Sequence, residues 1–281
     1  MASLDFRPAI SFGYEELAGL FTRGFEGYFV PIVLDAALVE LIFRTEAVDL
    51  SQSLVALRGT EPVGMMTVAR RGRTSRVQSM SVVKEARRSG VGRALIERGI
   101  QDARARCDLT LELEVITANL AAVALYESVG FTQVSGLVGF SGPGVESDGP
   151  IGQLVEVRPT EVATAMIAAS ETNLPWQISP FTLANFVRPS LAFRFEDHAY
   201  AVISAPTAER ASIRNLWVRP EFRGQGRGRR LMAALNDAYP NRTWAISPIV
   251  PDGRLDAFMQ TLGFAPMELR QWWMRMSFAS N

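Results

Sequence analysis

The sequence has little cysteine or histidine, with one residue of each among 281. The single cysteine, Cys107, has no partner for an internal disulfide, which fits a reducing, cytoplasmic setting. One cysteine and one histidine, His198, also fall short of a conventional zinc site, and no GxSxG motif is present for a triad through His198. We therefore expect no metal. Cys107 follows Ile100 and Ala103 at helical spacing, and we expect it to be a small, buried residue.

An excess of charge of either sign is absent, because Lys and Arg number 29 and Asp and Glu also number 29. No global field attracts nucleic acid or an anionic membrane. No apolar run reaches the roughly 18 residues of a membrane span, and the start MASLDFRPAISF lacks the apolar core of a signal peptide. We therefore expect a cytoplasmic protein, monomer or dimer, with neither nucleic acid nor membrane as a partner.

What the sequence does contain is a repeated plan. Residues 79–100 and 215–235 each show an apolar run, then arginine and glycine, then an amphipathic helix, and a Gly-Phe pair follows each. Arg87 and Arg223 lie 136 residues apart (223 minus 87). Two copies of a domain of about 130 to 140 residues fit the chain length. The Gly- and Pro-rich stretch FSGPGVESDGPIG separates them, so we expect domains at residues 1–142 and 152–281.

The order of elements indicates a mixed sheet, because several short strands precede a strand–helix–strand unit. The second half restarts with a strand in LVEV and a helix capped near Thr160. In the first half we expect strands at 6–10, 53–58, 63–70, 77–83, 109–116 and 132–138, and helices at 14–25, 34–45, 91–107 and 120–129.

The arginine–glycine turns lie where a strand leads into a helix. The first amides of a helix have no internal acceptor, and together with the helix dipole they favour an anion. Gly90 and Gly92 let an anion approach the backbone closely, and the turn 223–228 repeats the design with more glycine. The pattern favours a phosphate or pyrophosphate. It matches neither a P-loop nor a Rossmann fingerprint, and a helix start that binds nothing, or one that binds a nucleotide, stays open.

The pattern [QR]xxGx[GA] after an apolar strand, followed by a strand, Asn, Tyr and Gly-Phe, resembles the GNAT acetyltransferase superfamily in both halves. The resemblance implies an α/β (α+β) protein of two tandem GNAT folds, each a mixed, mostly antiparallel sheet flanked by helices, with acetyl-CoA as co-substrate. It implies coenzyme-binding residues in the first half at Val82, Val83, Arg87, Arg88, Gly90, Val91, Gly92, Arg93 and Asn119. The matching positions of the second half are Val218, Arg223, Gly224, Gly226, Gly228 and Arg229.

The segment LEVITANLAAVALYESVGF is similar to the ribosomal-protein-alanine N-acetyltransferases within that superfamily. This similarity implies that Glu114 is the base that deprotonates the amine and that Tyr126 is the acid that protonates the leaving thiolate. A backbone N–H near Val82 would stabilise the oxyanion. Two plainer interpretations stay open: Glu112 and Glu114 share a strand face and could both be solvated, and Tyr126 could be a packed aromatic. For Tyr28, Phe29 and Trp176 a core role is the stronger interpretation.

The second half departs from this pattern. Methionine cannot donate a proton to a thiolate, and Pro248 and Pro251 interrupt the strand that would carry the base. We therefore expect a degenerate second domain that keeps the phosphate turn and loses the catalytic set. An ungapped alignment on the Gly-Phe pairs places Met259 at the position of Tyr126, Asp252 at that of Asn119 and Ser247 at that of Glu114.

The sequence thus predicts an acetyl-CoA-dependent N-acetyltransferase that acts by direct attack of a primary amine on the thioester, with its chemistry in the N-terminal half. The acceptor would be a small-molecule or peptide amine. The alternative is a non-catalytic acyl-CoA-binding or regulatory module.

Overall fold

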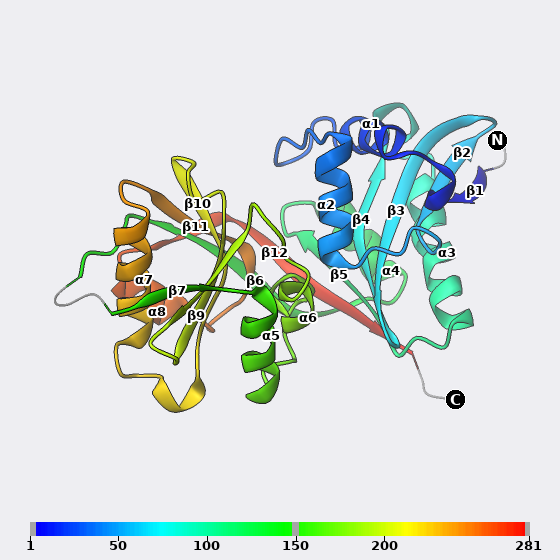
Figure 1. Cartoon of the computed structure of the whole chain (residues 1–281). Helices are drawn as coiled ribbons and strands as arrows, with labels where there is room; N and C mark the ends of the chain where they lie inside the picture. The colour runs from blue at the N-terminus through cyan, green and yellow to red at the C-terminus, as the bar shows by residue number, and fades with distance from the viewer. Residues whose placement is uncertain (1–3, 148–151, 279–281) are drawn as a thin grey trace. The chain divides into compact units, whose positions relative to one another are not determined.

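The computed structural model describes residues 4–147 and 152–278 (Figure 1). The chain divides into two compact units. Unit 1 comprises residues 1–115, 119–134 and 273–281, and unit 2 comprises residues 116–118 and 135–272. The last strand, β12 (Ala265–Ser277), therefore begins in unit 2 and ends in unit 1. The fold of unit 1 includes residues from both ends of the chain.

Unit 1 is built on a sheet in which the order of strands is β1-β2-β3-β4-β5-β12. The pairs from β1 to β4 are antiparallel, and β4 pairs with β5 in parallel. Valine, leucine, methionine and alanine fill most of the buried positions of β2 and β3, which suits strands covered on both faces. The strands are β1 (Leu4–Pro8), β2 (Leu54–Arg58), β3 (Glu61–Arg71), β4 (Thr74–Val82) and β5 (Thr110–Ile116).

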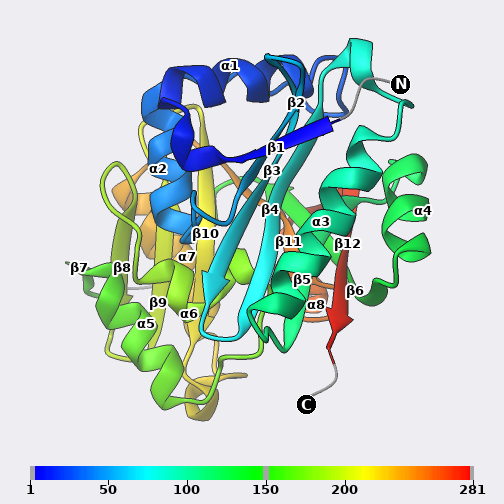
Figure 2. The same cartoon turned by 90° about the vertical axis from the view of Figure 1, so that its right-hand side faces the viewer.

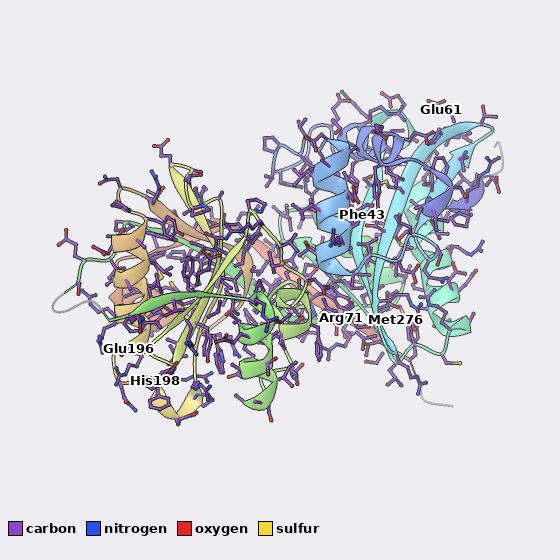
Figure 3. All side chains as sticks on the ribbon, in the orientation of Figure 1. Phe43, Glu61, Arg71, Glu196, His198 and Met276 are labelled. Carbon is purple, nitrogen blue, oxygen red and sulfur yellow. The ribbon has the colours of Figure 1, made fainter. Side chains whose placement is uncertain are left out.

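Two layers of helices cover this sheet. Helices α1 (Tyr14–Gly24) and α2 (Ala36–Glu46) lie on one face, and α3 (Val91–Ala105) and α4 (Leu120–Ser128) lie on the other (Figure 2). Phe43 of α2 points into the core toward the aromatic rings of α1 (Figure 3). These elements confirm the expected order, with boundaries that move by a few residues.

The interpretation of Cys107 as a buried residue was wrong. Helix α3 ends at Ala105, so the helical spacing does not extend to Cys107. The residue instead has a left-handed backbone, with φ of 58°, and its amide donates to the carbonyl of Arg104. This is the arrangement of a residue just past a helix end, and it leaves the side chain exposed.

Unit 2 has the strand order β12-β6-β11-β10-β9-β8-β7, with β10 and β11 parallel and the pairs from β10 to β7 antiparallel. Helices α5 and α6 lie on one face of β9 and β10, and α7 and α8 lie on the other (Figure 1). The strands are β6 (Thr132–Gly142), β7 (Leu154–Val157), β8 (Leu191–Phe195), β9 (Ala199–Ser204), β10 (Arg210–Val218) and β11 (Thr243–Pro251). The helices are α5 (Pro159–Ala168), α6 (Pro180–Leu183), α7 (Arg227–Ala238) and α8 (Asp256–Thr261).

Two local expectations for unit 2 need correction. Helix α5 begins with Pro159 at its first position and Arg158 at the N-cap, so Thr160 is not the cap; proline suits this position because its missing N–H would have no partner there. Pro248 lies within β11, and Pro251 is its last residue. The pairing of β11 with β6 shifts register between Ile246 and Val250, and this irregularity accommodates Pro248.

The mixed, mostly antiparallel sheet flanked by helices is confirmed in both units. Among the described residues, no helix is both long and apolar enough to span a bilayer.

Candidate functional site

The candidate site of unit 1 begins where two parallel strands part. Strands β4 and β5 pair from Thr74 and Thr110 as far as Val77 and Leu113. Strand β4 continues to Val82 and remains paired with β3 to its end. The carboxyl ends of β4 and β5 are therefore not joined to each other. In open α/β sheets, ligands bind outside the carboxyl ends of parallel strands where their connections diverge.

The turn that follows β4 presents a row of backbone amides. The first amide of α3 with a backbone acceptor is that of Ala94, which donates to the carbonyl of Gly90 at 3.0 Å. Among the described residues, the amides from Arg88 to Arg93 find no acceptor. Arg88 and Gly90 both have left-handed backbones, with φ of 61° and 87°, and a Cβ on Gly90 would meet nothing within 4 Å. An open, amide-lined cradle of this kind suits an anion.

Arg87 stabilises this turn through hydrogen bonds to backbone carbonyls. Its Nε donates to the carbonyl of Val82 at 3.1 Å, and its Nη2 donates to the carbonyls of Gly24 at 3.0 Å and Glu26 at 2.7 Å. The guanidinium is thus bound to the protein's own backbone, and it joins the end of β4 to the end of α1. The side chain of Arg87 fixes the shape of the turn and is not left free to reach a ligand.

The other cations of the turn are differently placed. Arg88 makes no hydrogen bond or ion pair with any described residue, and its neighbour Ser89 accepts from Arg58 at 3.0 Å. Arg93 is shared between Glu97 at 3.3 Å and the hydroxyl of Ser128 at 2.9 Å. The turn therefore keeps at least one unpaired positive charge beside its free amides.

Some backbone groups at the end of β4 are already hydrogen-bonded within the protein. The amide of Val83 donates to the carbonyl of Val63 at 3.0 Å, and the carbonyl of Val82 accepts from Arg87. Of the two residues expected to pair with the pantetheine arm, Val83 therefore has its amide committed to β3. Gly92 has open surroundings, because a Cβ there would make only ordinary contacts, the nearest at 3.7 Å.

Tyr126, Asn119 and Tyr28 gather beyond the end of β5. Tyr126 of α4 is 6% exposed, and its ring packs edge-on against Phe131 with a centroid distance of 5.9 Å. Burial, with a smaller effect of the neighbouring Tyr28, raises the pKa of Tyr126 well above its ordinary value. Asn119 caps α4 by accepting from the amide of Ala122, and its side chain is hydrogen-bonded to Tyr28. The Tyr126 hydroxyl therefore carries its proton throughout the neutral range.

Glu114 is buried and is held by one of its two oxygens. Nε of Arg76 donates to Oε2 of Glu114 at 2.6 Å, and Nη1 of Arg76 binds Glu46 of α2 at 2.5 Å. The other oxygen, Oε1, is buried without a hydrogen-bond partner in the described part of the chain. Burial raises the pKa of Glu114, and the charge and hydrogen bond of Arg76 oppose that rise. Buried polar atoms normally have partners, so Oε1 is where a water or a substrate proton would fit.

Neither strand glutamate is solvated. Glu112 is 7% exposed and accepts from the indole of Trp273 at 3.2 Å and from Arg275 at 2.8 Å, both in unit 1. The charge of Arg76 also acts on Arg71, which is labelled in Figure 3. Burial and this charge lower the pKa of Arg71 to about 10. The interpretation that both glutamates are surface residues is therefore excluded.

Sequence reasoning missed three residues of this site. Arg76 carries no distinctive motif, and arginine in a strand is ordinarily exposed. Tyr28 was assigned to the core, and its contact with Asn119 depends on the path of the loop between α1 and α2. Trp273 is separated from Glu112 by 161 positions along the chain. Of the other aromatic candidates, Trp176 is buried, whereas Phe29 is 50% exposed and is not a core residue.

The turn of unit 2 copies the backbone of the first turn. Gly224 and Gly226 have φ of 71° and 74°, at the positions that match Arg88 and Gly90, and the amide of Arg230 donates to Gly226. Arg223 also donates to the preceding strand, at the carbonyl of Val218. The backbone geometry of an anion cradle is therefore present twice.

The charges and the packing around the turn of unit 2, residues 223–228, differ from those of the turn of unit 1. Arg223 binds Glu171 at 2.5 Å, and Arg227 and Arg230 both bind Glu196 (labelled in Figure 3). Gly228 packs against the ring of Phe258, where a Cβ would lie 2.8 Å from Cζ, so this glycine serves helix packing. Arg229 donates to the carbonyl of Thr261. Two glutamates thus offset part of the positive charge of this turn.

The residues of unit 2 aligned with the proposed catalytic set differ from it in chemistry and in surroundings. Met259 is fully buried, and Ser247 is exposed. The carboxylate of Asp252 pairs with Arg270 at 2.9 Å. Met259 has no proton to donate, and the carboxylate of Asp252 is already paired.

Comparison with known proteins identifies the family. The model of the "Acetyltransferase (GNAT) family" matches residues 15–131, and that of the "Acetyltransferase (GNAT) domain" matches residues 192–266. Together these matches cover more than half of the chain. The chain therefore belongs to the GNAT family, a family of acetyltransferase enzymes, and it carries two domains of that family.

Individual relatives agree with this assignment. The chain is 44% identical over 57 residues to the [ribosomal protein bS18]-alanine N-acetyltransferase of Escherichia coli K12, and the match spans 20% of this chain and 38% of that protein. Among solved structures, a putative acetyltransferase from Pyrococcus horikoshii has a TM-score of 0.72 at 15% identity, over 100% of this chain and 91% of its own. A tandem GNAT protein from the clavulanic acid biosynthesis pathway has a TM-score of 0.70 at 18% identity, over 99% and 100%. These two similarities show the fold.

Proposed function

We propose that the protein is an acetyl-CoA-dependent N-acetyltransferase that moves an acetyl group to a primary amine by direct attack of the amine on the thioester, with the chemistry in unit 1. The proposal rests on one observation, that three features occur together at the carboxyl ends of β4 and β5. These are the parting of the two strands, the amides of residues 88–93 without acceptors, and the buried, protonated hydroxyl of Tyr126.

The residues of unit 1 fit the coenzyme. The free amides and the unpaired charge of Arg88 suit its pyrophosphate, with Gly90 and Gly92 leaving room for close approach. The backbone of β4 near Val82 faces the strand-free gap that an extended pantetheine arm would enter. Asn119 stands at the start of α4, three residues after the end of β5. When bound, acetyl-CoA supplies the acetyl thioester that the amine attacks.

The chain's own groups would handle the protons. Oε1 of Glu114 has no partner among the described residues and can accept a proton from the amine, directly or through water, while Arg76 holds Oε2 and fixes the orientation of the carboxylate. Tyr126 keeps its proton at neutral pH and can donate it to the sulfur. A backbone N–H near Val82 would stabilise the oxyanion, a contribution of roughly 3 to 4 kcal/mol for such a donor.

We place no chemistry in unit 2. Glu171 and Glu196 offset part of the positive charge at its glycine-rich turn, and its Met259 cannot act as an acid. The domains that we infer, residues 1–142 as catalytic and 152–281 as degenerate, describe this division of roles. The strand β12 nevertheless completes unit 1, so the catalytic unit requires the full chain.

A thiol-release assay with acetyl-CoA and a panel of amines tests the proposal. The similarity to enzymes named for the N-terminal alanine of a ribosomal protein makes a peptide with a free N-terminal alanine the first acceptor to try; amino acids, polyamines and aminoglycosides complete the panel. The proposal predicts thiol release that depends on an amine. Calorimetry that detects acetyl-CoA binding, combined with no turnover of any amine, would instead support a non-catalytic acyl-CoA-binding module. Tighter binding of ATP than of CoA would support a nucleotide site.

A further inference from the structure

The two glutamates of β5 lie on one face of the strand but have different surroundings. Glu112 and Glu114 are two residues apart, about 6.6 Å along the strand, and both are buried. Both oxygens of Glu112 have donors, because Oε1 accepts from Arg275 at 2.8 Å and Oε2 accepts from the indole of Trp273 at 3.2 Å. Arg76 donates to one oxygen of Glu114, and the other has no donor among the described residues. Of the two carboxylates, Glu114 is therefore the one with an oxygen available to a proton.

The donors of Glu112 come from the last strand, β12, whose place in unit 1 is fixed by hydrogen bonds. The amide of Phe278 donates to the carbonyl of Leu109 at 2.9 Å, and the hydroxyl of Thr132 donates to the carbonyl of Arg275 at 3.2 Å. The guanidinium of Arg275 also lies over the ring of Trp273, 5.0 Å from its centroid. Its side chain is 29% exposed. The positive charge of Arg275 is thus held in one position beside β5.

Other buried charges surround Glu114, and together they form what we call the charged layer. Its members are Glu46 from α2, Glu112 and Glu114 from β5, Arg71 from β3, Arg76 from β4 and Arg275 from β12. Tyr28 and Tyr126 have raised pKa values and stay uncharged in the neutral range. With all members ionised, the three carboxylates balance the three guanidinium groups. Loss of Arg275 would leave an excess of negative charge beside Glu114.

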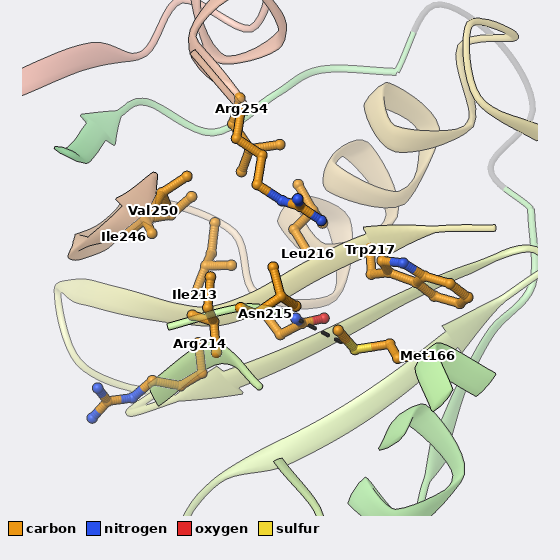
Figure 4. A pocket seen from close by; sticks show the side chains of 12 residues that line it. Met166, Ile213, Arg214, Asn215, Leu216, Trp217, Ile246, Val250 and Arg254 are labelled. Carbon is orange, nitrogen blue, oxygen red and sulfur yellow. Dashed lines mark hydrogen bonds between the residues drawn. The ribbon is translucent and has the colours of Figure 1, made fainter. Parts of the chain in front are cut away.

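The second copy of the fold has neutral residues where unit 1 has its two glutamates. Aligned on the Gly-Phe pairs, with an offset of 133 (264 minus 131), Ala245 matches Glu112 and Ser247 matches Glu114. Figure 4 shows this end of β10 and β11, where the guanidinium of Arg214 points away from the other labelled side chains. The sheet therefore forms without carboxylates at these positions. Because buried ion pairs are weak evidence for stability, the charged layer points to a role in the chemistry of unit 1.

We propose that Arg275 is a positioning residue for the reaction of unit 1: it cancels the charge of Glu112, so that Glu114 is the glutamate of β5 that takes up the proton. The inference rests on the proposed role of Glu114 as the base. Two buried carboxylates on one strand face compete for a proton when neither has a counter-charge. Arg275 removes Glu112 from this competition. It acts through Glu112, and we assign it no contact with the substrate.

The net charge of the Glu112–Arg275 pair sets the direction of each expected change. In the wild-type chain this pair presents no net charge to Glu114. Glu112→Gln leaves the positive charge of Arg275, which favours the ionised form of Glu114 and lowers its pKa. Arg275→Met leaves the negative charge of Glu112, so the two glutamates should take up their first proton at higher pH. The double variant is neutral again and should behave as the wild-type chain does.

Carbon-detected NMR titration of the side-chain carboxyl groups in the full chain measures these changes. The signal of Glu114 is assigned by its loss in Glu114→Gln. Its midpoint should fall by about one pH unit in Glu112→Gln and return close to the wild-type value in Glu112→Gln/Arg275→Met. In Arg275→Met the signals of Glu112 and Glu114 should move together, at a higher pH than in the wild-type chain. The control is Arg98→Met, which breaks an exposed pair with Asp102 on α3 and should leave the Glu114 midpoint in place.

An unmoved Glu114 midpoint in Glu112→Gln would overturn the inference, and so would a double variant that keeps the displacement of the single variant. Glu112→Gln retains the shape of the side chain, so the test remains decisive even if Arg275→Met does not fold. Turnover tests the role of Glu114 separately, because the acid limb of kcat should move with the NMR midpoint. A limb that stays in place while the midpoint moves would overturn the assignment of Glu114 as the base.

Discussion

Arg76 and Glu114 are joined by a hydrogen bond of 2.6 Å at the point where β4 and β5 separate. Arg76 lies within the paired stretch, and Glu114 is the first residue of β5 beyond it. Both side chains are buried, at 2% and 4% exposure, and Arg76 also holds Glu46. The ion pair therefore joins the stability of unit 1 to the orientation of the proposed base.

Arg76→Met should strongly destabilise the chain. The substitution keeps much of the side-chain volume but leaves two carboxylates, Glu46 and Glu114, without their shared partner. Breaking a buried pair in this way costs about 3 to 5 kcal/mol in free energy of unfolding. Urea denaturation measures this loss. The matched control is Arg70→Met, because Arg70 binds Asp49 at 3.3 Å with both side chains 30% exposed; it should cost about 1 kcal/mol or less. Equal losses would contradict the account.

The pH profile of kcat should have an acid limb set by Glu114. The base acts in its ionised form, so kcat should rise as pH rises through the pKa of Glu114. Burial raises that pKa, and the limb should therefore lie above the ordinary glutamate value of about 4.3. Glu114→Gln should remove the limb and lower the plateau by about 10² to 10⁴. An unchanged profile in this variant would exclude Glu114 as the base.

In the same pH profile, kcat should not fall at alkaline pH through loss of the Tyr126 proton. Its pKa is raised by burial, so the acid stays protonated well into the alkaline range.

Tyr126→Phe should separate catalysis from packing. The phenyl ring retains the edge-on contact with Phe131, so the free energy of unfolding should change little, whereas kcat should fall by about 10² or more because the proton donor is lost. Tyr28→Phe is the control, since Tyr28 neighbours Tyr126 and is bonded to Asn119 but is assigned no proton transfer, and it should lower kcat less. Steady-state kinetics and thermal unfolding of both variants measure these effects on kcat and on stability. A larger loss in Tyr28→Phe would reverse the proposed roles.

Gly92 and Gly228 occupy matching positions but should respond oppositely to alanine. At Gly228 a Cβ would lie 2.8 Å from the ring of Phe258, so Gly228→Ala should destabilise the chain by about 1 to 3 kcal/mol through overpacking. At Gly92 the nearest atom is 3.7 Å away, and Gly92→Ala should be neutral or slightly stabilising. Gly92→Ala should instead raise the KM for acetyl-CoA, because it narrows the approach to the cradle. Thermal unfolding and kinetics test the pair.

The sequence predicted the elements of unit 1 well because local signals specify them. The helix in residues 91–105 has an apolar face and a glycine at its N-cap, and the strand in 110–116 alternates as expected. The duplicated turn was also predictable, since glycine at Gly90 and Gly226 supplies the left-handed backbone that the turn requires.

The sequence could not predict contacts that depend on tertiary structure. The side chain of Arg87 reaches backbone carbonyls at the end of α1 and just after it, and no local pattern encodes these partners. The partners of Glu112 come from β12, at the far end of the chain. Cys107 was misplaced because an apolar periodicity does not specify where a helix ends.

Isothermal titration calorimetry of acetyl-CoA binding to Ser89→Glu and Gln225→Glu tests the central claim most directly. The two positions match across the repeat, and each variant adds one negative charge just before a helix start, where it favours the fold. The account predicts that Ser89→Glu weakens binding more than tenfold, because the charge repels a phosphate held by the first turn, while Gln225→Glu leaves it unchanged. Weakening by Gln225→Glu alone, or by neither variant, would contradict a coenzyme site at residues 88–93.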